Sequence, residues 1–364
     1  MAQNGNSAQK KVAILIENGV EDAEFQVPYE GLKQAGMDVV VLGARMNEKY
    51  TGKLGKVSMS ADATTAEAMA GDYDAVVIPG GMAPDVMRRN PNTVNFVKDA
   101  MQQGKLIAAV CHGPQVLIEG DLLKGKQATG FVAIRKDMIN AGANYHDQAL
   151  VVDGNLITSR QPGDLAIFTT AILSRLGYGG QAADLPNEQD ANAEWWKLAT
   201  AWGGSTKGEI VKALNTALAG ERYSLEALQK YAEKESDAEI NSVFQQIMAN
   251  KQRHIQMLEA RLDQLGEKPS LAANIANQYA KVKTALTGSD DIYQLRSALG
   301  DVQTGIGDIG NLMPSLTDPV STELFTQIYQ DLLASEQHLV KLYQARVGSD
   351  AKPAKPTTGT AVTM

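Results

Sequence analysis

The sequence is poor in three features: cysteine, aromatic residues and long apolar runs. Its 364 residues include one cysteine, Cys111, so no disulfide can form within the chain and a reducing, cytoplasmic location is expected. No run of about 18 apolar residues occurs, and residues 1–9 are polar, so we expect neither a membrane span nor a signal segment. Aromatic residues make up 5% and the net charge is −8, which argues against nucleic acid as a partner.

The composition that remains indicates a globular chain of two domains. Hydrophobic residues are 44% and charged residues 21% of a length that exceeds one ordinary domain. In the first half, short β-branched runs alternate with amphipathic stretches. Strands are predicted at 11–16, 38–42, 75–78, 106–110, 128–130, 150–152 and 156–159, and helices at 91–103, 113–120, 134–141 and 163–176. This alternation predicts a mostly parallel sheet covered on both faces, with an antiparallel edge hairpin at Asp153-Gly154.

Polar motifs follow three of these strands, at the end of a parallel sheet where chemistry gathers. They are residues 17–22 (ENGVED), residues 79–81 (PGG) and residues 111–114 (CHGP). The third is a strand-to-helix turn, and a helix beginning near Gly113 would lower the thiol pKa of Cys111. His112 would add to this effect or act as a base, and the backbone N–H groups of Gly80, Gly81 and His112 could form an oxyanion hole. Composition alone favours an inert core thiol, whereas this turn favours a reactive one.

Several motifs together resemble the PfpI-type intracellular protease/amidase family. The motifs are VEDAE, IPGG, AVCHGPQ, DMINAGA and VVDGNLITSRQPGDL, spread between about Lys10 and Leu176. The family belongs to the class I glutamine amidotransferase-like superfamily, which includes the parkinsonism-associated protein deglycase. The resemblance implies a flavodoxin-like α/β sandwich with Cys111 as nucleophile, Glu21 as the acid that hydrogen-bonds the thiol, and His112 beside it.

Some positions within the motifs keep alternative interpretations. Asp85 matches an acid that reaches a neighbouring subunit's site in hexameric relatives, but the family usually has Glu there, which weakens a protease triad. A solvated loop acid is the other interpretation for Asp85 and for Glu21. Glu17 fits the same turn as Glu21, although the VED register favours Glu21. His146 is expected in a surface loop.

The resemblance implies carbonyl chemistry at a thiolate. Relatives are described as cysteine peptidases, cofactor-free glyoxalases, deglycases and stress chaperones. A thiohemiacetal needs a thiolate, a proton shuttle such as Glu21 and oxyanion donors, whereas peptide hydrolysis also needs a base that protonates an amine. We therefore predict a cysteine-dependent hydrolase or lyase without a cofactor, acting on a small carbonyl compound or on a glycated or peptide substrate, in a homo-oligomer. The alternatives are a non-catalytic redox sensor or chaperone, and a ferritin-like metal-handling protein.

Helical patterns replace strands in the second half. A linker is predicted at 181–204, with a short helix on which Trp195, Leu198 and Trp202 share a face. Helices follow at 206–235, 237–265 and 319–347, with a third helix broken at 287–291; together they predict a four-helix bundle over 205–347. Residues 1–9 and the tail 348–364 are predicted to be disordered.

Polar residues interrupt the apolar stripes of this bundle: Glu221, Lys251, His254, Ser335 and His338. A ferritin-like di-metal site takes a Glu from two helices and Glu-x-x-His from the other two. Both histidines are present but both motif glutamates are missing, so the bundle resembles ferritin-like, rubrerythrin-related domains with the metal site largely lost. We predict instead that Lys251 pairs with Glu221, because a buried acid without a partner is costly. An altered metal site at Glu221, His254 and His338 is the alternative.

Overall fold

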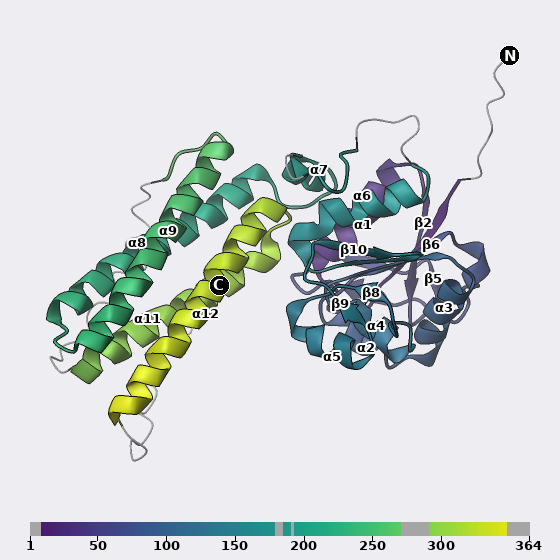
Figure 1. The fold of residues 1–364 in the computed structure, drawn as a ribbon. Helices are drawn as coiled ribbons and strands as arrows, with labels where there is room; N and C mark the ends of the chain where they lie inside the picture. Colours follow the sequence, from purple (N-terminus) through teal and green to yellow (C-terminus); the bar gives the residue numbers. More distant parts are fainter. Residues whose placement is uncertain (1–8, 179–184, 191–192, 271–290, 348–364) are drawn as a thin grey trace. The chain divides into compact units, whose positions relative to one another are not determined.

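The computed structural model of the chain describes residues 9–178, 185–190, 193–270 and 291–347 (Figure 1). The described residues divide into two compact units. One runs up to Ile210 and includes Met313–Glu323, and the other comprises Val211–Leu312 and the residues from Leu324 onward. The predicted disordered tail and, apart from Gln9, the predicted disordered N-terminus lie outside the described residues. Residues 181–184 and 191–192 of the predicted linker also lie outside the described residues, as does the part of the predicted third bundle helix before residue 291.

The first unit is built on a seven-stranded sheet of order β10-β11-β7-β6-β1-β2-β5. Its strands are β1 (Lys11–Leu15), β2 (Asp38–Gly43), β5 (Ala63–Thr64), β6 (Ala75–Ile78), β7 (Leu106–Val110), β10 (Leu150–Asp153) and β11 (Leu156–Ser159). All neighbours pair in parallel except β10 and β11, which form the predicted antiparallel edge hairpin. The order reverses between β1 and β6, as in flavodoxin-like folds, so the predicted fold class is confirmed. The carboxyl ends of β1, β6 and β7 therefore meet at one place.

Helices cover both faces of this sheet because its central strands are apolar on both sides. Figure 1 shows α1 (Asp22–Gln34) and α6 (Leu165–Arg175) on one face, and α3 (Pro91–Gln102) and α4 (Pro114–Glu119) on the other. The shorter elements are α2 (Ala83–Met87), α5 (Arg135–Asn140) and the 3-10 turns Ala70–Asp72, Val132–Ile134, Pro162–Asp164 and Met313–Ser315.

Two small sheets complete the strands of the unit. The hairpin of β3 (Lys49–Thr51) and β4 (Ser58–Ser60) was not predicted, because its strands are short and mostly polar. The segment predicted as a strand at 128–130 forms β8 (Gln127–Ala128), which pairs with β9 (Asn144–Tyr145) outside the central sheet.

Two segments from later in the chain also belong to the first unit. Helix α7 (Trp195–Ala201) buries Trp195 and, just beyond its end, Trp202. A Cβ at Gly31 of α1 would lie 3.1 Å from the Trp202 ring, so glycine allows this contact. In the segment Met313–Glu323, Thr317 Oγ1 accepts a hydrogen bond of 2.8 Å from the Ser205 N–H.

The second unit is helical. Its elements are α8 (Lys207–Lys234), α9 (Ala238–Gln264), α11 (Asp291–Leu312) and α12 (Pro319–Val347), although the first turns of α8 and α12 belong to the first unit. The bounds of α8, α9 and α12 agree closely with those predicted, and α11 is the part of the third helix that follows the predicted break. Asp237 caps α9 by accepting hydrogen bonds from the N–H groups of Glu239 and Ile240, at 2.8 and 3.1 Å. Apolar stripes from the four helices form the core, among them Leu214, Leu218, Phe244, Ile247, Leu258, Leu295, Val302, Ile328, Leu332 and Leu339.

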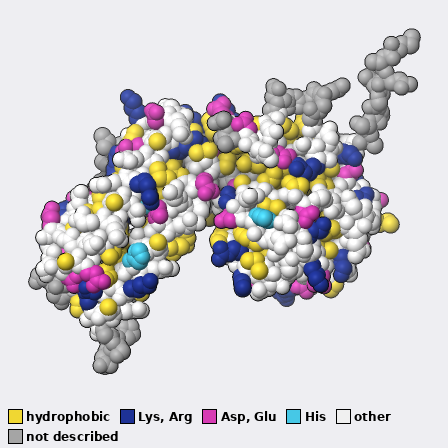
Figure 2. All heavy atoms as spheres, in the orientation of Figure 1, with side chains coloured by type: hydrophobic (Ala, Val, Ile, Leu, Met, Phe, Trp, Pro, Cys, Tyr) yellow, Lys and Arg dark blue, Asp and Glu magenta, His cyan; other side chains and the backbone are white. Residues whose placement is uncertain are grey.

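The surface is mixed in charge on the face that Figure 2 shows, where Lys and Arg side chains are interspersed with Asp and Glu. Among the described helices, none combines the length and apolar character needed to cross a membrane.

Candidate functional site

Cys111 stands on a tight turn directly after β7. Its φ is +59°, a left-handed conformation that L residues other than glycine rarely adopt. Two backbone hydrogen bonds hold it: the Cys111 N–H donates to Ser159 O at 3.0 Å, and the Phe131 N–H donates to Cys111 O at 2.9 Å. A Cβ at Gly113 would lie 2.3 Å from Ile78 O, so only glycine allows the chain to turn into α4 here. The predicted strand-to-helix turn is thus present and strained.

Glu24 is the acid that lies beside the thiol. Its side chain is fully buried, and its Oε2 accepts a hydrogen bond of 2.7 Å from the Gly80 N–H. A Cβ at Gly80 would lie 2.6 Å from this oxygen and 2.9 Å from Cys111 Cβ, so the carboxyl group and the thiol residue flank the same glycine. Burial, together with the charge of Glu21, raises the pKa of Glu24 to about 8. The carboxyl group can therefore hold or release a proton beside the sulfur near neutral pH.

Glu21 does not have the predicted position, because it precedes α1 as its N-cap residue whereas Glu24 lies inside the first turn. The Glu21 carboxylate pairs with Lys53 instead, with 3.4 Å between Oε2 and Nζ. Burial raises the pKa of Glu21. A sequence signal for Glu24 existed: it shares the buried face of α1 with Val27 and Gly31, at helical spacing.

The sulfur has an environment that opposes ionisation in one respect and favours it in another. Burial and the Glu24 carboxylate raise the pKa of the Cys111 thiol well above its ordinary value, while the backbone N–H groups of Gly81 and His112 partly oppose this. The predicted lowering by the start of α4 is therefore wrong in its net direction, because the thiol is only 7% exposed. Gly80 is also not a free oxyanion donor, since Glu24 takes its N–H.

His112 lies beside the thiol, but it does not form a triad with Asp85. His112 Nδ1 lies 3.4 Å from Cys111 Sγ, and its ring packs against Phe131 at 5.1 Å between centroids. Burial lowers the pKa of His112, and the charge of Asp85 partly opposes this. Asp85 is exposed on α2, and no hydrogen bond joins it to His112 within the described part of the chain.

Two other candidates lie elsewhere. Glu17 is buried and holds Arg45, with 3.1 Å between Oε1 and Nη2, so it is not an alternative to Glu24. His146 hydrogen-bonds Gln127 near the surface, as expected for a loop residue.

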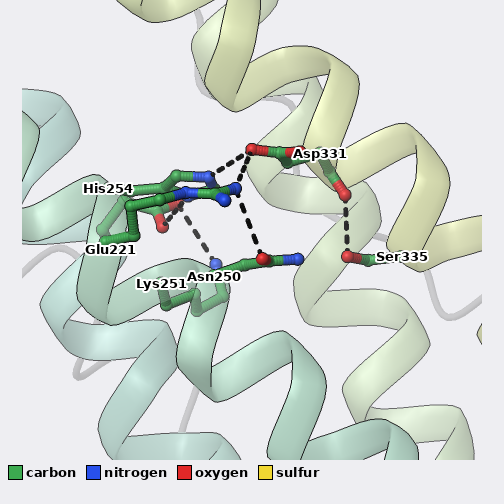
Figure 3. A network of polar contacts seen from close by, with 7 residues as sticks. Glu221, Asn250, Lys251, His254, Asp331 and Ser335 are labelled. Atoms are coloured by element: carbon green, nitrogen blue, oxygen red, sulfur yellow. Dashed lines mark hydrogen bonds and ion pairs between the residues drawn. The ribbon is translucent and has the colours of Figure 1, made fainter.

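The predicted ion pair of the bundle is present (Figure 3). Lys251 Nζ lies 3.2 Å from Glu221 Oε1, and both side chains are buried. His254 bridges two acids, with its Nδ1 2.9 Å from Glu221 Oε2 and its Nε2 3.0 Å from Asp331 Oδ2. Burial alone would raise the pKa of Glu221, but the charges of Lys251 and His254 hold it below its ordinary value. The cluster joins α8, α9 and α12.

These residues do not fit a metal centre. His338 is exposed and does not join Glu221 and His254; the residue of α12 that reaches His254 is Asp331, about two turns earlier. Both His254 ring nitrogens already face carboxylates. No group of three His, Cys, Asp or Glu residues is arranged for a metal among residues 9–178, 185–190, 193–270 and 291–347. Asp331 was missed, although it sits on the inner side of α12 beside the stripe of Ile328 and Leu332.

Comparisons with known proteins agree with both units. Residues 10–175 match the DJ-1/PfpI family, and residues 209–304 match a domain of unknown function, DUF2383. YraA of Bacillus subtilis (strain 168), whose name assigns it provisionally to the cysteine proteases, is 43% identical over 46% of this chain and 98% of its own. Protein/nucleic acid deglycase 2 of Escherichia coli (strain K12) is 38% identical over the same shares of the two chains.

A solved structure matches both units at once. It is a two-domain protein from Anabaena variabilis with DJ-1/ThiJ/PfpI-like and ferritin-like domains. It is 73% identical, covers 96% of this chain and 100% of its own, and has a TM-score of 0.90. The chain belongs to the DJ-1/PfpI family, and its sheet unit is followed by a helical domain that is ferritin-like in this relative.

Proposed function

We propose that the first unit is a cysteine-dependent enzyme for small carbonyl compounds, with glyoxalase- or deglycase-like activity. The observation that carries the proposal is the fully buried Glu24 carboxyl, which flanks Gly80 together with Cys111 and has a pKa raised to about 8. A thiol with a high pKa needs a neighbouring base, and an acid that titrates near neutral pH is suited to take and return the proton.

The chemistry balances with water as the only co-reactant. The Cys111 sulfur adds to the aldehyde carbon of an α-oxoaldehyde, and the thiol proton reaches the former carbonyl oxygen through Glu24. Glu24 then carries a proton from the former aldehyde carbon to the neighbouring carbon, and the proton on the former aldehyde oxygen moves to the neighbouring carbonyl oxygen, which gives a thioester of a 2-hydroxy acid. Water cleaves the thioester, releases the acid and restores the thiol. The N–H groups of Gly81 and His112 stabilise negative charge on the sulfur during these steps.

Peptide hydrolysis is the weaker alternative. It needs a base that protonates the departing amine, and His112 would need an acid to orient it. Asp85 makes no hydrogen bond to His112 in the described residues of this chain. The deglycase name of the Escherichia coli relative supports carbonyl chemistry, while the protease name of YraA keeps a peptide substrate as the competing outcome.

The test is methylglyoxal consumption and lactate formation by the full chain. Cys111→Ser and Glu24→Gln should each lose about a hundredfold or more of the rate. Glu21→Gln should lose less than Glu24→Gln, and Glu119→Gln, a surface change in the same unit, should leave the rate unchanged. Activity that survives in Cys111→Ser would overturn the proposal. Inactivity of the wild type together with oxidation of Cys111 by peroxide would favour the redox sensor, and casein cleavage would favour the peptidase.

A further inference from the structure

A lysine-bearing loop is fastened over the segment that carries the acids of the thiol site. Residues 52–57 join β3 to β4, and this loop holds Lys53 and Lys56. The Lys53 N–H donates to Val20 O at 2.8 Å, and the Gly19 N–H donates to Thr51 O at 2.9 Å. The hairpin is thus hydrogen-bonded to the residues between the end of β1 and the start of α1.

Asp22 at the start of α1 also holds this loop by hydrogen bonds. Its carboxylate is buried and accepts hydrogen bonds from the N–H groups of Leu54 and Val57, at 2.7 and 2.6 Å. A Cβ at Gly52 would lie 2.2 Å from Asp22 Oδ1, so the approach requires glycine. Because Asp22 stands between Glu21 and Glu24, these contacts set the place of Lys53 relative to both acids.

The Lys53 ammonium pairs with Glu21 and keeps N–H donors for a ligand. Its side chain is 44% exposed, whereas that of its partner Glu21 is 7% exposed. Among the described residues, the ammonium has Glu21 as its acceptor, with 3.4 Å between Lys53 Nζ and Glu21 Oε2. An ammonium group has three N–H donors, so donors remain for a ligand.

The charge of Lys53 also reaches both neighbours of the sulfur. Burial raises the pKa of Glu24 and lowers the pKa of His112. The positive charge of Lys53 lowers the pKa of both residues. The Glu21 N–H donates to Gly80 O at 3.3 Å, and a Cβ at Gly80 would lie 2.9 Å from Cys111 Cβ, so an anion bound at the Lys53–Glu21 pair would lie close to the reacting thiol.

We propose that Lys53 binds a carboxylate on the molecule that reacts with Cys111, so that the site selects carbonyl compounds that carry a carboxylate over neutral ones. The inference rests on the proposed function, whose product is itself a carboxylate. A fixed but half-exposed cation beside a buried thiol has the placement that recognition of a small anion requires.

The experiment compares two alkylating reagents that differ in charge. Iodoacetate is an anion and iodoacetamide is neutral, and both transfer their carbon to the Cys111 sulfur with release of iodide. In Lys53→Met the ratio of the iodoacetate rate to the iodoacetamide rate should fall by about five- to tenfold, the worth of one hydrogen bond between charged groups in an open site. The iodoacetamide rate itself should change little.

Matched variants separate binding from general attraction. Lys56→Met removes the same charge from the same loop and should leave the ratio near that of the wild type, and Lys53→Arg should restore most of it. An equal fall in Lys56→Met, an unchanged ratio in Lys53→Met, or a wild-type thiol that neither reagent modifies would overturn the proposal. Tryptophan fluorescence and circular dichroism establish that each variant is folded.

A second probe uses a carbonyl compound. Glyoxylate should protect wild-type Cys111 from iodoacetamide more strongly than acetaldehyde does, and Lys53→Met should abolish that preference. Alkylation and protection need no turnover. A changed ratio without methylglyoxal turnover would therefore support Lys53 and refute the proposed function, and turnover with an unchanged ratio would do the reverse.

Discussion

Glu24 combines two properties that a folded chain rarely places together: complete burial and a titratable group without a cation in contact. Its Oε2 accepts a hydrogen bond from the Gly80 N–H beside Cys111, and burial raises its pKa to about 8. Such a group is costly when ionised. Ionised Glu24 therefore lowers the stability of the first unit, but its shifted pKa lets it carry a proton at the sulfur.

The stability of the first unit should therefore depend on pH through Glu24. Between its ordinary pKa of 4.5 and about 8, the folded chain keeps a proton that the unfolded chain releases, so stability falls as pH rises through this window. Wild type should lose on the order of a few kcal/mol between pH 5 and 8, and Glu24→Gln clearly less. Urea unfolding followed by tryptophan fluorescence measures this, with Glu119→Gln as control. Parallel pH curves for wild type and Glu24→Gln would contradict the assignment.

At this scale, the sequence showed where the chemistry lies but not every residue that performs it. Cys111 could be placed at its turn because a buried strand and a glycine flank it. The choice between Glu21 and Glu24 depends on the residue at which α1 begins. A shift of that start by one residue changes which acid lies on the buried face of the helix, and helix starts are uncertain by this much from sequence. The net direction of the thiol pKa depends on burial, which no local motif reveals.

At the scale of elements, the bundle shows how a buried acid is tolerated without a metal. Lys251 and His254 on α9 both contact Glu221 on α8, and His254 also reaches Asp331 on α12 (Figure 3). Three helices are thus joined by charges in an apolar core. Helix bounds were predictable here because a periodic apolar stripe and an N-cap such as Asp237 define them locally. The β3–β4 hairpin was not, because its pairing depends on contacts with the loop after β1.

Breaking the buried Lys251–Glu221 ion pair should lower the free energy of unfolding more than breaking an ion pair on the surface. Lys251→Met leaves Glu221 buried with His254 alone and should destabilise the bundle by about 3 kcal/mol. Arg222→Met, which removes a half-exposed pair with Glu259, should cost about 1 kcal/mol or less. Because the pKa of Glu221 is lowered, its contribution is present above the unfolded pKa and is lost as pH falls through the folded pKa.

Chemical unfolding followed by far-ultraviolet circular dichroism compares these two variants. Glu221→Gln in the Lys251→Met background should recover part of the loss, since it removes the uncompensated buried charge. Equal losses in Lys251→Met and Arg222→Met would show that the buried pair carries no special weight.

At the scale of the whole molecule, the first unit is not a continuous stretch of chain. The segment Met313–Glu323 follows α11 and includes the first five residues of α12, but it belongs to the sheet unit. It packs at the turn after β11, where a Cβ at Gly163 would lie 2.5 Å from Thr322 Oγ1. Composition and periodicity separated an α/β half from a helical half, but a long-range contact of this kind has no local signature in the sequence.

This packing should be detectable with the tryptophans, all of which lie in the first unit, at positions 195, 196 and 202. Gly163→Ala forces Thr322 to move and should destabilise the first unit by about 1–3 kcal/mol, which lowers the denaturant midpoint of tryptophan fluorescence. Gly300→Ala is the control, because its Cβ would enter open space on α11 and should stabilise that helix by about 0.5–1 kcal/mol without lowering the midpoint. A midpoint unchanged in Gly163→Ala would mean that the segment Met313–Glu323 does not support the sheet unit, because the close contact at Thr322 would then be relieved without loss.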